Sequence, residues 1–260
     1  MPVVVSRDGT RIAYDKAGSG PPVILIDGAF CSREFGPMKK LAAVLAKTCA
    51  VITYDRRARG ASGDTAPYAV QREIEDIDAL MGAAGGRVTL YGISSGAVLA
   101  LLAAASLPVA RLALYEPPFM VGPHARTLPP DRTAALTRMI AEDRRSDAVK
   151  YYMTDIIGIA RFMPFLFQVL PMWRKLKAVA PSLPYDCAVM GDFSIPRDEA
   201  AAIRVPTLVM AGTKTWPVLL DAAKALAAAI PHARHETLPG QTHNVAASAI
   251  APVLTGFIKA

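Results

Sequence analysis

Short apolar runs, each bounded by Gly, Pro or Asp, recur through the first half of the chain and predict strands. Segments with the apolar spacing of helices separate the later runs. This alternation is typical of a mostly parallel, twisted sheet covered by helices on both faces. The predicted strands are Val3 to Val5, Pro22 to Ile26, Ala50 to Tyr54, Val88 to Tyr91 and Leu112 to Tyr115, and the predicted helices are Met38 to Lys47, Gln71 to Ala83 and Ser95 to Ser106.

The two ends of the chain complete this pattern. Val3 to Val5 and Arg11 to Tyr14 flank an Asp8-Gly9 turn, which predicts a hairpin and therefore an antiparallel edge. The last part of the chain predicts a strand, a helix, a strand and a closing helix, for a total of about eight strands. These elements are Pro206 to Ala211, Pro217 to Ile230, His235 to Leu238 and Val245 to Ile258.

The alternation stops between Glu116 and Val205. Helical segments at Asp131 to Asp143 and Ser146 to Ile157 are followed by a Phe-, Met- and Pro-rich tract, Ile159 to Val179. We predict a single α/β domain over residues 1–260, in which residues 119–200 form a helical lid inserted after the sixth strand. Its aromatic side chains, Phe162, Phe165 and Trp173 among them, either pack the lid onto the sheet or contact a substrate, because cores and pockets draw on the same apolar residues.

A G-x-S-x-G motif, Gly92-Ile93-Ser94-Ser95-Gly96, stands between a predicted strand and a predicted helix. A serine on such a sharp turn adopts a strained backbone, and its neighbours two residues away must be small so that strand and helix can pass closely. The turn places the hydroxyl at the carboxyl end of the sheet, where open α/β sheets bind their ligands. Ser94 is therefore the candidate nucleophile; a plain helix cap is the alternative.

A serine nucleophile needs a base, and the chain has four histidines. His124 lies at the Pro-rich start of the lid, and His232 and His235 flank the last strand like solvated polar residues. His243 follows the last strand within Gly240 to Asn244, at the sheet end where Ser94 is expected. We predict that His243 takes the Ser94 proton and returns it to the leaving group.

The chain resembles the α/β-hydrolase superfamily, in particular its small lidded serine esterases. The resemblance covers essentially the whole chain and rests on the Ser94 turn, the Gly240 to His243 turn, Ile24 to Ala29 and Tyr54 to Ser62. It implies a catalytic triad in the order Ser, acid, His. It also implies that Asp55 to Ser62, with Arg56, Arg57 and Arg59, is a structural turn rather than a phosphate site.

Two departures from the family pattern stand out. The strand Pro206 to Ala211 is followed by Gly212-Thr213-Lys214-Thr215, which holds no carboxylate where the family usually has its acid. Some relatives carry the acid one strand earlier, where this chain has Glu116, so Glu116 is the expected acid; Asp221, or no acid, are the alternatives. The second departure is Asp27, which stands before Gly28 where relatives often have His.

The resemblance also implies an oxyanion hole made by two backbone amides. One belongs to Ser95, after the nucleophile, and the other to Ala29 or its neighbour Phe30. We expect Phe30, Phe162, Phe165 and Trp173 to contact the substrate. Asp27 either caps or orients this loop, or its charge makes the site differ from that of relatives.

Composition excludes several function classes. The chain has 260 residues, 52% of them hydrophobic, with a net charge of +7 that is not gathered in one basic stretch, so no nucleic-acid partner is expected. Three scattered cysteines, Cys31, Cys49 and Cys187, indicate neither a zinc site nor a disulfide scaffold. No secretory signal and no apolar run of about 18 residues is evident, so a cytoplasmic protein without a membrane span is expected.

These observations predict a serine hydrolase that cleaves a carboxylic ester, or a related acyl bond, of a small hydrophobic molecule through an acyl-enzyme on Ser94. Neither a cofactor nor a metal is expected. One alternative is a C–C bond hydrolase or lyase that uses the same Ser94 and His243. The other is a small-molecule receptor that has lost catalysis. Two features suggest it: the absence of an acid after the strand Pro206 to Ala211, and the presence of Asp27.

Overall fold

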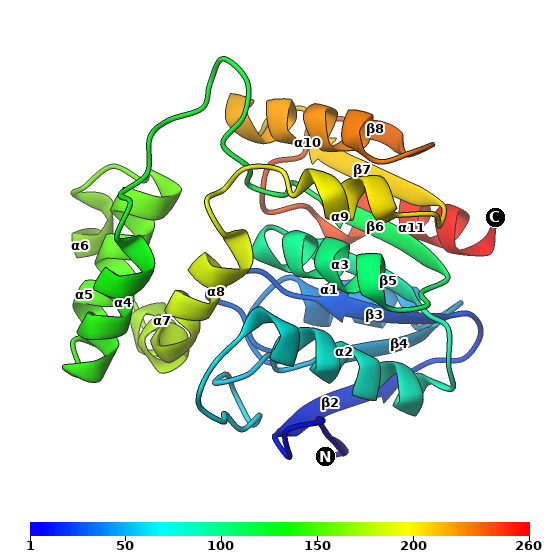
Figure 1. The fold of residues 1–260 in the computed structure, drawn as a ribbon, viewed down its shortest axis with the longest axis horizontal. Helices are drawn as coiled ribbons and strands as arrows, with labels where there is room; N and C mark the ends of the chain where they lie inside the picture. The colour runs from blue at the N-terminus through cyan, green and yellow to red at the C-terminus, as the bar shows by residue number, and fades with distance from the viewer.

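The strands form one eight-stranded sheet in the order β1-β2-β4-β3-β5-β6-β7-β8, in a computed structural model that describes residues 1–260 (Figure 1). Only the two pairings at one edge, β1 with β2 and β2 with β4, are antiparallel; the other five are parallel. The predicted fold class is confirmed. The strands are β1 (Val3–Val5), β2 (Arg11–Ala17), β3 (Pro22–Ile26), β4 (Ala50–Tyr54), β5 (Thr89–Ile93), β6 (Arg111–Tyr115), β7 (Thr207–Gly212) and β8 (Arg234–Leu238).

Both faces of the sheet are buried because successive side chains of each strand point to opposite sides. On β3, Ile24 and Ile26 belong to the larger apolar cluster, whereas Val23 and Leu25 belong to the smaller one. The larger cluster lies under α2 (Val70–Ala84), α3 (Ser95–Ser106) and α10 (Pro217–Ala229). The smaller cluster lies under α1 (Met38–Leu45) and α11 (Ala247–Lys259), which contact each other.

A helical insertion occupies the chain between β6 and β7 and extends beyond the sheet on one side (Figure 1). Its elements α4 and α8 contact each other, and α8 and α9 also contact α3 of the sheet domain. No helix of the protein is long and apolar enough to cross a bilayer. The elements are α4 (Arg132–Ala141), α5 (Arg145–Tyr151), the π-helix η1 (Tyr152–Ile157), α6 (Met163–Phe167), α7 (Met172–Val179), the 3-10 helix η2 (Ala180–Ser182), α8 (Leu183–Met190) and α9 (Arg197–Ala202).

Candidate active site

Ser94 lies on a sharp turn between β5 and α3, with φ 56° and ψ −129°. A non-glycine residue rarely adopts a positive φ, and holding one costs about 1–3 kcal/mol, so the surrounding structure must impose it. Two glycines make the turn possible: a Cβ on Gly92 would lie 2.2 Å from the Gly96 carbonyl oxygen, and a Cβ on Gly96 would lie 2.3 Å from the Ile26 carbonyl oxygen. The G-x-S-x-G motif is therefore required by backbone packing at this position.

His243 and Glu116 form a close pair at the carboxyl ends of the strands. The Nδ1 atom of His243 lies 2.7 Å from Oε2 of Glu116, the residue that follows β6. The Glu116 side chain is fully buried, and two further groups donate hydrogen bonds to it: the Gly212 amide at 2.8 Å and the Thr215 hydroxyl at 2.9 Å. A buried carboxylate needs such donors to offset the loss of water, and here three of them fix its position.

The segment Gly212 to Thr215, at the end of β7 and directly after it, lacks the usual family acid but holds both members of this pair. Besides its two hydrogen bonds to Glu116, it ties down the turn that carries His243. The Lys214 amide donates to the Gln241 carbonyl at 2.8 Å, and the Gly240 amide donates to the Thr213 hydroxyl at 2.8 Å. Sequence reasoning missed this role because the amides of Gly212 and Lys214 make two of these bonds, and backbone groups leave no mark in residue type. The hydroxyls of Thr213 and Thr215 are the side-chain signals.

Trp216 is a further residue that the sequence did not single out. Its ring stacks on the His243 imidazole, with the ring centroids 6.1 Å apart and the planes 20° from parallel. The indole side chain is 48% exposed. It covers His243 at the start of α10, so the imidazole is held from one side by Glu116 and along one face by an aromatic ring.

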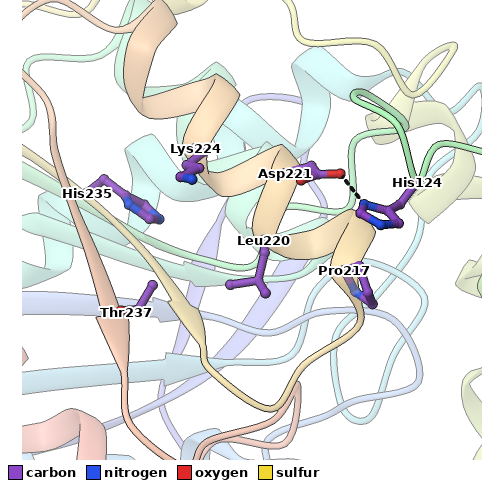
Figure 2. A pocket seen from close by; sticks show the side chains of 7 residues that line it. All are labelled: His124, Pro217, Leu220, Asp221, Lys224, His235 and Thr237. Atoms are coloured by element: carbon purple, nitrogen blue, oxygen red, sulfur yellow. Dashed lines mark hydrogen bonds and ion pairs between the residues drawn. The ribbon is translucent and has the colours of Figure 1, made fainter.

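Asp221, the alternative acid, lies elsewhere. Figure 2 shows it on α10, paired with His124 from the start of the insertion, with Oδ2 2.7 Å from Nδ1. The two residues line a cavity of about 270 Å³ together with Lys224 and His235, among others. The structure thus brings Glu116, and not Asp221, to His243.

The loop after β3 passes directly against the nucleophile. A Cβ on Gly28 would lie 2.9 Å from the Ser94 Cβ, so only glycine permits the approach. Neither Ala29 nor Phe30 donates a hydrogen bond from its amide to another group of the protein. Phe30 has a φ of 64°, and its ring meets the edge of Tyr152 in the insertion at a centroid distance of 5.2 Å.

Asp27 lies beneath this loop with its carboxyl group buried. Its Oδ1 atom has no hydrogen-bond partner, and the side chain lies beside Cys31 and Gly36. Burial raises the pKa of Asp27 to about 7, although the positive charges of Arg59 and Arg56 act in the opposite direction. A carboxyl group in this position holds a proton far more readily than an exposed aspartate does.

The three arginines after β4 are buried and engaged by carboxylates. Arg56 makes a two-pronged contact with Glu73 at 2.7 Å, and Arg57 makes a similar one with Asp76. Arg59 donates to Asp186 at 2.6 Å and to the Gly28 carbonyl at 2.6 Å. These partners support the interpretation of Asp55 to Ser62 as a structural turn, since all three guanidinium groups are already occupied.

Asp186, on α8 of the insertion, joins three parts of the site. It is fully buried and accepts hydrogen bonds from Arg56, from Arg59 and from the Ser95 hydroxyl at 2.8 Å. Burial alone would raise the pKa of Asp186, but the charges of Arg59 and Arg56 outweigh it and hold the pKa below its ordinary value. One carboxylate therefore links the insertion, the turn after β4 and the first residue of α3.

The predicted substrate contacts in the insertion differ in their exposure. Phe162 and Phe165 are 63% and 61% exposed, whereas Trp173 is buried and donates from its indole nitrogen to Ser146 at 3.2 Å. No hydrogen bond or ring contact joins these three residues to Ser94, His243 or Glu116. Substrate contact by these three residues stays a prediction.

No group of three or more His, Cys, Asp or Glu side chains in the chain is arranged to hold a metal ion, and the three cysteines are unpaired. A strained serine, a histidine held by a buried glutamate, and a loop with two unused amides beside the serine are the parts of an acyl-transfer site.

Comparison with known proteins identifies the family and the fold. A model of the alpha/beta hydrolase family matches residues 19–254. An alpha/beta hydrolase from Sphaerobacter thermophilus is 50% identical, with a TM-score of 0.92 over 98% of this chain and 99% of that one. The enol-lactonase from Burkholderia xenovorans (23% identity, TM-score 0.71, all of both chains) and an esterase from Exiguobacterium antarcticum (20%, 0.74, 99% of both) share the fold.

No protein of curated function matches the chain. The family match nevertheless spans nearly the whole sequence, and half of the residues are identical to those of a solved relative of the same length. The chain belongs to the alpha/beta hydrolase family.

Proposed function

We propose that this hydrolase cleaves a carboxylic ester or a related acyl bond, such as a lactone, of a small hydrophobic molecule through an acyl-enzyme on Ser94. The observation that carries the proposal is the buried Glu116 at 2.7 Å from His243, in a fold that presents Ser94 on a strained turn at the same end of the sheet. Esterase and lactonase activities are named for two proteins that share this fold, which is consistent with the proposal.

In the proposed reaction, Glu116 fixes which nitrogen of His243 acts as the base. Because Glu116 engages Nδ1, that nitrogen carries the proton and Nε2 is left as the acceptor. Nε2 takes the proton of the Ser94 hydroxyl as its oxygen attacks the acyl carbon, and then gives the proton to the leaving alcohol. Water repeats the sequence on the acyl-enzyme and releases the acid.

The amides of Ser95 and of Ala29 or Phe30 would stabilise the oxyanion of both tetrahedral intermediates. The latter two amides have no acceptor within the protein and lie in the loop that Gly28 brings against Ser94. Each such donor typically contributes about 3 kcal/mol to transition-state stabilisation. Phe30 would also place its ring against the acyl group, which favours an apolar substrate.

The first experiment is labelling with a fluorophosphonate, followed by intact mass measurement. The probe reports an activated serine without requiring the natural substrate. We expect one adduct on the wild-type protein and on Ser106→Ala, whose serine is exposed at the far end of the same helix, and none on Ser94→Ala. Hydrolysis of p-nitrophenyl butyrate should follow the same pattern.

Absence of an adduct on the folded wild-type protein would overturn the proposal. An adduct that persists on Ser94→Ala would also overturn it, because the reactive serine would then be another one. Labelling without turnover of any ester in a panel of esters and lactones would leave the nucleophile but exclude ester cleavage, and would favour the C–C bond chemistry considered above.

A further inference from the structure

The loop after β3 and the start of α3 each offer an amide to the proposed oxyanion hole, that of Ala29 and that of Ser95. The Ala29 amide donates to no other group of the protein. Ser95 is the first residue of α3, so its amide has no acceptor within the helix. Such donors stabilise an oxyanion only when they are aimed at the place where its charge develops. The groups that fix their directions lie in other parts of the chain.

Arg59 holds the peptide unit that contains the Ala29 amide. Its Nη1 atom donates to the Gly28 carbonyl at 2.6 Å and to the Cys31 carbonyl at 3.2 Å. The bond between Gly28 and Ala29 is trans, so its C=O and N–H lie in one plane and point in opposite directions. By holding the Gly28 carbonyl, Arg59 therefore sets the direction of the Ala29 amide.

Asp186, in the insertion, holds Arg59 in turn. Its Oδ2 atom accepts from Nη2 of Arg59 at 2.6 Å, and no other carboxylate forms an ion pair with this guanidinium. The remaining donor of Arg59, Nε, goes to the Ser182 hydroxyl at 2.9 Å. Both charged side chains are buried, so water does not take the place of either partner. The position of Arg59 therefore depends on Asp186.

The other oxygen of Asp186 reaches the second donor of the oxyanion hole. Its Oδ1 atom accepts from the Ser95 hydroxyl at 2.8 Å and from Nη1 of Arg56 at 2.7 Å. The same Arg56 nitrogen lies 3.4 Å from the carbonyl oxygen of Asp27, at the start of the loop. Asp186 belongs to α8, which contacts α3 (Figure 1). One carboxylate thus anchors the residues on both sides of the hole.

We propose that Asp186 is a positioning residue of the oxyanion hole, which it fixes through Arg59 on one side and through the Ser95 hydroxyl on the other. The inference rests on the proposed function, since an oxyanion forms only when Ser94 attacks an acyl carbon. Asp186 makes no hydrogen bond to Ser94 or His243, so it acts on the reaction through the two amides. The insertion thereby supplies part of the geometry that stabilises the transition state.

The main variant for the test is Asp186→Asn. Whichever way the new amide is turned, its NH2 group faces either the guanidinium of Arg59 or the donors of Arg56 and Ser95, so at least one of these bonds is lost. We expect kcat for p-nitrophenyl butyrate to fall about 100-fold while KM stays within about twofold of the wild type, because the oxyanion hole is used only in the transition state.

The matched control is Asp76→Asn. Asp76 is also a buried carboxylate in a two-pronged contact with an arginine, Arg57, at 2.7 Å. The hydrogen bonds of this pair reach neither the loop after β3 nor Ser95. Asp76→Asn should therefore lose stability as Asp186→Asn does but keep the wild-type kcat.

Ser95→Ala is a milder variant that keeps the amide and removes only the hydroxyl. It tests one side of the hole even if Asp186→Asn does not fold. Losing one hydrogen bond to a charged group should lower kcat by about tenfold with KM unchanged. Ser106→Ala, at the far end of the same helix, should match the wild type.

Inhibition by trifluoromethyl propyl ketone separates positioning from a merely structural role. The Ser94 oxygen adds to the carbonyl carbon of this ketone, the proton passes to Nε2 of His243, and the carbonyl oxygen becomes an oxyanion. In Asp186→Asn and Ser95→Ala, Ki should rise by the factor by which kcat/KM falls. A smaller folded fraction would lower kcat and leave Ki unchanged. The pH at which kcat/KM is half-maximal should not move, because His243 and Glu116 keep their contacts.

Three outcomes would overturn the inference while the wild type is active: wild-type kcat in both Asp186→Asn and Ser95→Ala, a lower kcat with an unchanged Ki, or an equal loss of kcat in Asp76→Asn. Each of them leaves the proposed function standing. Absence of a fluorophosphonate adduct on the folded wild-type protein would instead overturn the proposed function and this inference together.

Discussion

The protein contains two histidine–carboxylate pairs with the same nitrogen–oxygen distance and different surroundings. In both, Nδ1 of the histidine lies 2.7 Å from a carboxylate oxygen: His243 with Glu116, and His124 with Asp221. Glu116 is fully buried and receives two further hydrogen bonds, whereas the Asp221 and His124 side chains are 24% and 53% exposed. An exposed pair of this kind contributes at most about 1 kcal/mol, because water and salt screen it.

The comparison teaches that the distance between histidine and carboxylate does not identify a catalytic pair. What separates the two is the environment of the carboxylate and the position of the pair in the fold. Glu116 receives hydrogen bonds from Gly212, at the end of β7, and from Thr215 just after it, and both bonds hold the carboxylate beside His243. Asp221 sits on the side of a helix and faces a cavity open to solvent (Figure 2).

The two pairs should differ most in the loss of kcat that follows when each histidine is replaced. His243→Ala should lower kcat for p-nitrophenyl butyrate by about 10⁴- to 10⁶-fold, since the serine loses its base. His124→Ala is the matched control and should stay within about twofold of the wild type, as expected for an exposed surface pair. Steady-state kinetics on both variants makes the measurement. A comparable loss in His124→Ala would show that the second pair takes part in the reaction.

The carboxylates should differ nearly as much. Glu116→Gln keeps the shape of the side chain but allows His243 to adopt the wrong tautomer, which should lower kcat by about 10⁴-fold. Asp221→Asn should again stay within about twofold. Full activity in Glu116→Gln would remove Glu116 from the reaction and leave Ser94 and His243 to act as a dyad.

Asp27 is a third carboxylate to compare with Glu116 and Asp221. It is buried like Glu116 but lacks the hydrogen-bond donors that Glu116 has. Its pKa is raised from 3.8 to about 7 by burial, so the folded protein binds its proton more tightly than the unfolded chain does. The free energy of unfolding therefore falls as the pH rises from about 4 to about 7, by up to about 1.4 kcal/mol for each pH unit, and is lowest above about pH 7.

Asp27→Asn removes this titration. Relative to the wild type, the variant should gain unfolding free energy steadily from about pH 4 to about pH 7 and show little further gain above that. Urea unfolding of both proteins across this range makes the measurement, and the values near pH 4 serve as the internal reference. A difference between the two proteins that does not change with pH would mean that Asp27 titrates normally.

The smallest effect concerns one donor of the buried pair. Thr215→Val removes the hydroxyl that donates to Oε2 of Glu116, the oxygen that also contacts His243. Losing one hydrogen bond to a charged group should lower kcat by about tenfold. Thr215→Ser restores the hydroxyl and should recover most of the activity. Equal rates for the Val and Ser variants would show that Gly212 and His243 suffice to hold Glu116.

Most of the fold could be predicted from the sequence because its strands are short apolar runs separated by turns and helices. The predicted helix Gln71 to Ala83 is observed as Val70–Ala84, and the predicted strand His235 to Leu238 as Arg234–Leu238. Such elements are set by local spacing, which the sequence displays. The predicted helix Ser146 to Ile157 continues instead as a π-helix from Tyr152, a change in backbone pairing that apolar spacing does not reveal.

The candidate site could be predicted only where residue type carries the signal. Ser94 and His243 stand in turns that the sequence marks with glycines. The support for Glu116 comes from the Gly212 amide and the Thr215 hydroxyl, whose positions depend on how β6 and β7 pair. The exposure of Phe162 and Phe165 was equally out of reach, because an apolar spacing that usually faces a core looks the same when it faces solvent.

The hydrogen bonds of Asp186 bear on how such proteins can be recombined. Although α8 belongs by sequence to the insertion, its carboxylate is held by Arg56 and Arg59 and receives the Ser95 hydroxyl beside the nucleophile. A graft that exchanges the whole insertion would break these bonds and leave two buried arginines short of a partner. A chimera built to transplant specificity should therefore take its new segment from within α4 to α7 and keep α8 from the parent that supplies Ser94.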